Sequence, residues 1–153
     1  MRKIAVLLSL MAVIIVFTTG CKKEEDNPTP SGGTMSLKAD GTEWSATLAV
    51  VASNSGGIIT VTGSDSNAHQ AQVIVMGSST GTYQIVQGGA NSGRWTTGLG
   101  QNDTYSANGI IGSGTITITE LTATSVSGTF SFQGVNTAQN TVSVTDGQFS
   151  ANF

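Results

Sequence analysis

Hydrophobic and polar residues alternate along most of the chain beyond about residue 34. Ile116 and Ile118 alternate with threonines, and Phe130 and Phe132 alternate with Thr129 and Ser131. A period of two puts one set of side chains on a core face and the other in solvent, as half-buried antiparallel strands require. The pattern predicts an all-β domain of about nine or ten short strands, near residues 34–39, 42–52, 57–64, 69–76, 80–87, 92–97, 102–107, 113–120, 124–133 and 140–153.

Glycine-containing turns separate these segments. Asp40-Gly41, Asn108-Gly109 and Asp146-Gly147 are dipeptides typical of two-residue type I′ hairpins, in which both central residues need positive φ. Evenly spaced short strands with such turns predict an antiparallel β-sandwich or an up-and-down barrel, and the pattern leaves these two architectures open.

A different pattern precedes the β domain. Arg2 and Lys3 are followed by an apolar run, Ile4–Phe17, that is interrupted only by Ser9. As a helix this run would be about 21 Å long at roughly 1.5 Å per residue, which is too short for a hydrocarbon core of about 30 Å. Length and flanking charge instead favour a cleaved secretory signal peptide over residues 1–20.

The signal ends at Cys21, the only cysteine of the chain. The segment Thr18-Thr19-Gly20-Cys21 resembles the lipobox of bacterial lipoproteins, which implies that Cys21 becomes a lipidated N-terminus. The following charged run, 22–26, resembles the tether of Bacteroidota lipoproteins on the outer face of the outer membrane, and Pro28 and Pro30 extend this linker. We therefore expect a signal peptide at 1–20, a linker at 21–33, a β domain at 34–153, and a lipid-anchored position in the outer membrane at the cell surface.

The composition of the β domain excludes several classes of function. Its two basic residues, Lys38 and Arg94, stand against six acidic ones, so its net charge is −4 and it lacks the clustered basic residues of nucleic-acid-binding proteins. His69 is the only possible histidine base, and lipidation would consume the only thiol. We therefore predict no enzyme activity, no metal site and no cofactor. The cluster Asp65-Ser66-Asn67 offers calcium a weak ligand set, which a turn explains equally well.

Aromatic residues allow a binding hypothesis instead. Arg94 and Trp95 follow a stretch rich in glycine and asparagine, and Tyr105 lies close by in the sequence. If Trp95 and Tyr105 were exposed together, the 88–108 region would suit a glycan or a protein partner. The alternative is that Trp95 covers the core, which is the position we predict for Trp44 because it begins an alternating strand.

Several short motifs resemble a family of Bacteroidota lipoproteins with a domain of unknown function of the DUF6252 kind. They are Asp40-Gly41-Thr42-Glu43-Trp44, Gly81-Thr82-Tyr83, Gly114-Thr115-Ile116-Thr117-Ile118, Ser127-Gly128-Thr129-Phe130-Ser131-Phe132 and Val144-Thr145-Asp146-Gly147-Gln148-Phe149. Each motif joins a turn to a strand, and together they span roughly residues 35–153. The resemblance implies a β-rich, surface-anchored domain and no known activity.

Overall fold

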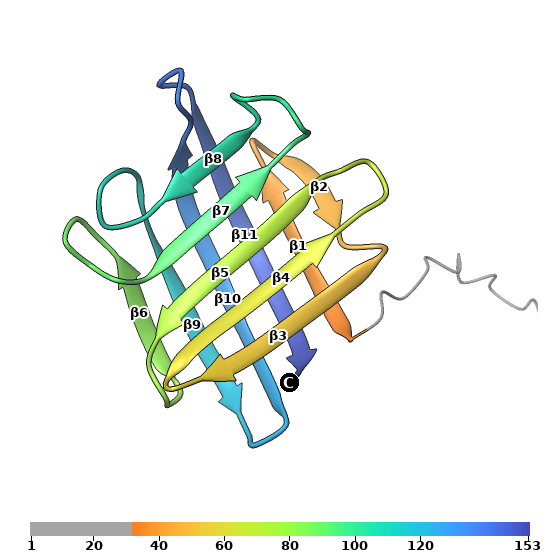
Figure 1. The fold of residues 1–153 in the computed structure, drawn as a ribbon, viewed down its shortest axis with the longest axis vertical. Helices are drawn as coiled ribbons and strands as arrows, with labels where there is room; N and C mark the ends of the chain where they lie inside the picture. Colours follow the sequence, from red (N-terminus) through yellow and green to blue (C-terminus); the bar gives the residue numbers. More distant parts are fainter. Residues whose placement is uncertain (1–31) are drawn as a thin grey trace, which may run out of the picture.

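The structure, a computed structural model, describes residues 32–153. The signal helix expected in residues 1–20, the lipidation site Cys21 and nearly all of the linker lie outside the described residues. Every regular element from residue 32 onward is a strand, so this part contains no helix that could span a bilayer. The eleven strands are β1 (Gly33–Ala39), β2 (Thr42–Ser45), β3 (Ala49–Ser55), β4 (Ile58–Ser64), β5 (Gln70–Met76), β6 (Gly81–Ile85), β7 (Ser92–Thr96), β8 (Thr104–Ala107), β9 (Ser113–Leu121), β10 (Ser125–Val135) and β11 (Thr141–Asn152) (Figure 1).

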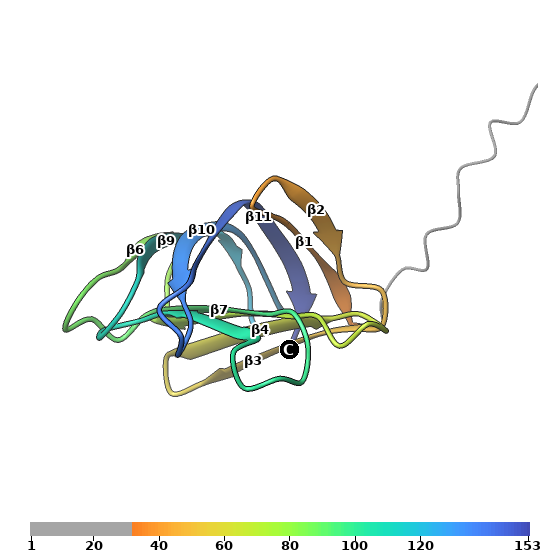
Figure 2. The ribbon, with the colours of Figure 1, turned by 90° about the horizontal axis from the view of Figure 1, so that it is seen from above.

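All strands belong to one antiparallel sheet that curls over on itself into two layers (Figure 2). The order β6-β9-β10-β11-β1-β2 forms what we call the arched layer, and β8-β7-β5-β4-β3 forms the flat layer. One residue pair, Val135 with Ser106, joins β10 to β8 and thus connects the layers. The predicted all-β antiparallel class is confirmed. The described sheet is an open half-barrel with edges at β2, β3 and β6, rather than a closed barrel.

The strand order is only partly up-and-down. Runs such as β3-β4-β5 and β9-β10-β11 pair in sequence, but β6 leaves its neighbours to pair with β9, and β1 pairs with β11. The strand predicted at 42–52 is two strands, because the chain changes layers at Ala46. The Ala46 amide still donates to the Met35 carbonyl in β1, whereas the amides of Thr47 and Leu48 donate to the Ser64 carbonyl in β4.

The core lies between the two layers, and the predicted alternation determines which residues enter it. Phe130 and Phe132 are 4% and 3% exposed, whereas Thr129 and Ser131 between them face solvent. This confirms the predicted register of β10, and Trp44 is buried as predicted. Inward residues of the flat layer, among them Val61 and Val73, complete the core from the other side.

The prediction of a two-residue hairpin turn is wrong for two of the three dipeptides. Asp40-Gly41 does form the β1–β2 turn, with φ of 48° and 82°. Asn108-Gly109 begins a longer loop between β8 and β9, because the Asn108 side chain accepts hydrogen bonds from the amides of Ile110 (2.8 Å) and Ile111 (3.2 Å). Asparagine thus organises this loop through its side chain rather than through a two-residue turn.

Asp146-Gly147 lies inside β11 and forms a β-bulge. Phe130 pairs with Gly147 and Phe132 with Val144, so Thr145 and Asp146 together oppose the single residue Ser131. Asp146 has φ of 52°, which explains why the dipeptide carries the sequence signature of a turn. The bulge leaves Thr145 and Asp146 both exposed, while burial alternates normally on either side of them.

Candidate functional site

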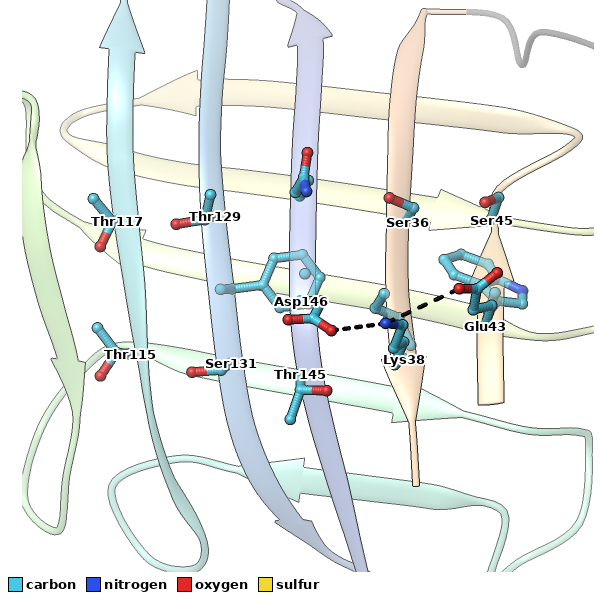
Figure 3. A pocket seen from close by; sticks show the side chains of 15 residues that line it. Ser36, Lys38, Glu43, Ser45, Thr115, Thr117, Thr129, Ser131, Thr145 and Asp146 are labelled. Atoms are coloured by element: carbon cyan, nitrogen blue, oxygen red, sulfur yellow. Dashed lines mark ion pairs between the residues drawn. The ribbon is translucent and has the colours of Figure 1, made fainter. Parts of the chain in front are cut away.

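A groove of about 900 Å³ lies on the outer face of the arched layer (Figure 3). We call it the outer groove. Five neighbouring strands, β9, β10, β11, β1 and β2, present their outward side chains to it. These are Ser36, Lys38, Glu43, Ser45, Thr115, Thr117, Thr129, Ser131, Thr145, Asp146 and Gln148. Leu37, Trp44 and Phe130 also border the groove, but their side chains are buried in the core.

The register of the sheet arranges these side chains in two rows across the strands. Each row crosses five strands that are roughly 4.8 Å apart, and the rows are two residues, or about 6.7 Å, apart along the strands. Figure 3 shows both rows from outside the sheet. One row is Thr117, Thr129, Gln148, Ser36 and Ser45, and the other is Thr115, Ser131, Thr145 with Asp146, Lys38 and Glu43.

Hydrogen bonds between neighbouring strands hold two of these side chains in place. The hydroxyls of Thr117 and Thr82 are 3.2 Å apart, and the Thr115 hydroxyl donates to the Gln84 side chain over 3.2 Å. A hydroxyl has one donor and two acceptor lone pairs, so one such bond leaves capacity for a ligand. The outer groove therefore offers both hydrogen-bond donors and hydrogen-bond acceptors at fixed positions.

The only charged side chains among the lining residues form a small ion-pair group. Lys38 Nζ is 3.1 Å from Asp146 Oδ2 and 4.0 Å from Glu43 Oε1. Lys38 comes from β1, Glu43 from β2 and Asp146 from the bulge in β11, so three strands contribute to the group. Two carboxylates against one ammonium give the outer groove a net charge of −1.

The lining residues include no histidine or cysteine. Within residues 32–153 no three His, Cys, Asp or Glu side chains are placed to hold a metal ion. The arrangement can form many hydrogen bonds with a ligand, and its two carboxylates, those of Glu43 and Asp146, both lie beside Lys38.

The sequence-predicted binding residues do not form a shared surface. Trp95 in β7 pairs with Tyr105 in β8, but Trp95 is only 4% exposed and Tyr105 is partly buried against the core. Arg94 is exposed on the outer side of the flat layer, because successive residues of a strand point to opposite faces. The hypothesis of a ligand stacking on Trp95 in the 88–108 region thus lacks the exposed ring that it requires.

Trp95 instead belongs to a group that we call the Asp65 cluster, made of the buried Asp65, Trp44 and Trp95 and the partly exposed His69. The Asp65 carboxylate accepts hydrogen bonds from Trp44 Nε1 (2.9 Å) and from the backbone amides of Asn67 (2.8 Å) and His69 (3.0 Å), and it lies 2.8 Å from His69 Nδ1. The two tryptophan rings meet edge to face at 5.0 Å, and the His69 ring stacks on Trp95 at 5.7 Å.

The electrostatics of Asp65 follow from this environment. Burial of the carboxylate acts to raise its pKa, but the hydrogen bonds from His69, Trp44 and the backbone amides outweigh burial, so the pKa of Asp65 lies below its usual value of 3.8. The segment predicted as a turn or a weak calcium site is therefore a turn capped by its own carboxylate. The contact with Trp44 was not foreseeable, because 21 residues separate the partners and no pattern links them.

No curated protein and no solved structure is similar to the chain at a significant level. A family model described as a domain of unknown function, DUF6252, matches residues 32–151, which is nearly the whole described sheet from β1 into β11. The chain therefore belongs to the DUF6252 family.

Proposed function

We propose that the protein is a lipid-anchored surface protein of the outer membrane, and that its β domain is a non-enzymatic binding module for a glycan. The outer groove is the proposed binding site, in place of the 88–108 region. The observation that carries the proposal is the pair of polar rows across five strands, which present hydroxyl, amide and charged groups along the outer groove.

The composition of the outer groove favours a glycan over a protein partner. Protein interfaces rely on apolar or aromatic anchors at their centre. All outward side chains along the two rows are polar, and the nearest aromatic rings, Trp44 and Phe130, are buried. Sugars present hydroxyls that both donate and accept hydrogen bonds. Serine, threonine and glutamine side chains also donate and accept, so they can pair with these hydroxyls.

The position of the groove also suits a tethered protein. The described chain begins beside the C-terminal strand, where Gly33 pairs with Ala151. Lys38 lies five residues further along β1, about 17 Å away at roughly 3.4 Å per residue. A domain held from the Gly33 end thus carries the ion-pair end of its outer groove away from the attachment point.

We expect that Cys21→Ser abolishes lipid attachment and releases the protein from the membrane fraction. The reason is that Ile4–Phe17 is too short to span a bilayer, so the acyl chains on Cys21 would provide the attachment. Incorporation of labelled fatty acid into wild type and variant measures this, with Ser31→Ala in the linker as the control. Label in the Cys21→Ser variant equal to that in wild type would contradict the lipoprotein proposal.

The glycan proposal is tested by removing hydroxyls without changing shape. The double substitution Thr117→Val and Thr129→Val deletes two neighbouring hydroxyls of one row, and valine keeps the branched side chain that suits a strand. We expect at least a fivefold loss of affinity for the neutral glycans that wild type binds, because each of the two lost hydrogen bonds contributes about 0.5–1.5 kcal/mol. Screening the full-length protein in detergent against a neutral glycan array, followed by calorimetry, measures this.

A matched control lies on the outer side of the flat layer. Thr60 and Thr62 are also partly exposed on a central strand, and Thr62 accepts a hydrogen bond from Gln72. Thr60→Val with Thr62→Val should leave glycan affinity unchanged. An equal loss in both double variants, or no binding of wild type to any neutral glycan, would contradict the proposed site.

A further inference from the structure

We propose that Glu43 and Asp146 make the outer groove selective for uncharged glycans by neutralising Lys38, so that carboxylated and sulfated glycans are rejected. This inference rests on the proposed glycan-binding function. Its basis is the ion-pair group at one end of the groove, where Lys38 Nζ lies 3.1 Å from Asp146 and 4.0 Å from Glu43. Lys38 is the only cation among the lining residues, and both of its partners are acidic.

The carboxylate of Asp146 reaches the groove because of the bulge in β11. In a regular strand only one of two successive residues faces outward, but both Thr145 and Asp146 are exposed here. The extra outward position is filled by an acid next to Lys38, and bulges commonly re-aim a side chain in this way. The irregularity therefore adds one negative charge to a surface that would otherwise be neutral at this end.

Stability does not account for this charge arrangement. The side chains of Glu43 and Asp146 are 85% and 63% exposed, and that of Lys38 is 40% exposed. Ion pairs as exposed as these contribute little to folding, because water and salt screen them. So weak an ion pair does not explain why an acid fills the outward position at 146, whereas an effect on what enters the groove does.

The negative charge affects the binding of a charged glycan more than it affects folding, because the glycan carries its own charges repeatedly along a polymer. Two like charges a few ångströms apart repel each other even in water. At 0.1 M salt the screening length is about 10 Å, so the unpaired negative charge acts over two polar rows that are about 6.7 Å apart. A neutral glycan meets no such repulsion and can use the hydroxyl rows fully.

The test reverses the charge of the groove. Glu43→Gln with Asp146→Asn leaves Lys38 unpaired and changes the net charge from −1 to +1, and asparagine tolerates the positive φ at position 146. We expect this double variant to bind polygalacturonate oligosaccharides at least tenfold more tightly than wild type in low salt. Its affinity for neutral xylan or mannan oligosaccharides should change less than threefold.

The matched control is Asp103→Asn with Glu120→Gln, which makes the same change in net charge away from the lining residues. A similar gain with this control would show a general charge effect and overturn the inference. Unchanged rejection of polygalacturonate by the groove double variant, with neutral binding retained, would also overturn it and leave the proposed function intact. Absence of neutral glycan binding by wild type would instead contradict the proposed function itself.

Discussion

Replacing Phe130 with alanine is expected to lower the free energy of unfolding by about 3–5 kcal/mol. Phe130 is 4% exposed, and its ring lies 6.2 Å from those of Phe132 and Phe149. The ring also covers Gly147 on the neighbouring strand, where an added Cβ would lie 2.7 Å from the ring. Because glycine has no side chain that could fill the space, the cavity left by alanine stays open and the cost belongs in this range.

An alanine substitution on the other face of β10 is the control for Phe130→Ala. Thr129→Ala changes an exposed residue next to Phe130, and it should cost less than about 1 kcal/mol. Urea unfolding of wild type and both variants, followed by circular dichroism, measures the two values. Similar losses in the two variants would show that β10 does not have the register described.

A second large effect is expected at Asp65. Asp65→Asn should lower the free energy of unfolding by about 2–3 kcal/mol, because the amide that replaces one carboxylate oxygen cannot accept from Trp44 Nε1. His69 can change its tautomer to face an amide, whereas the indole can only donate. Tryptophan fluorescence is a direct readout, since both tryptophans belong to the Asp65 cluster. Glu120→Gln, an exposed change of the same chemical kind, should have almost no effect.

The pH dependence has a definite sign. The pKa of Asp65 is lower in the folded protein than in the unfolded chain, so the unfolded chain binds more protons at acidic pH. The contribution of the carboxylate is fully present above its unfolded pKa of about 3.8 and is lost as the pH falls through the folded pKa below that value. The stability difference between wild type and Asp65→Asn should therefore shrink over the acidic interval below about pH 4. A constant difference over this interval would rule out ionised Asp65 as the stabilising species.

The sequence predicted what depends on local alternation. Phe130 and Phe132 with their exposed neighbours are confirmed because the period of two is a property of every strand. The predicted hairpin turn at Asp146-Gly147 was wrong because positive φ is needed both in a type I′ turn and in a bulge. The dipeptide alone does not distinguish the two. Arg94 and Trp95 were grouped by their closeness in sequence, although strand geometry separates adjacent side chains.

The outer groove could not be predicted because it depends on which strands are neighbours. Ser36 lies in the first strand, Thr117 in the ninth and Gln148 in the last, and only the sheet order brings them into one row. Each outward threonine could be recognised from the alternation as solvent-facing. Their common surface appears only when β1 is placed beside β11 and β9 beside β10.

The pairing of β1 with β11 determines when the domain can fold. A chain that emerges N-terminus first can close the β1–β2 hairpin at once, because only two residues separate those strands. The other edge of β1 stays unpaired until the 12 residues of β11 have been delivered. Pairing between such distant segments is slow, and open strand edges are prone to aggregation in the meantime. The arched layer, and with it the outer groove, is thus assembled only after Thr141–Asn152 has emerged, and one edge of β1 is open to association until then.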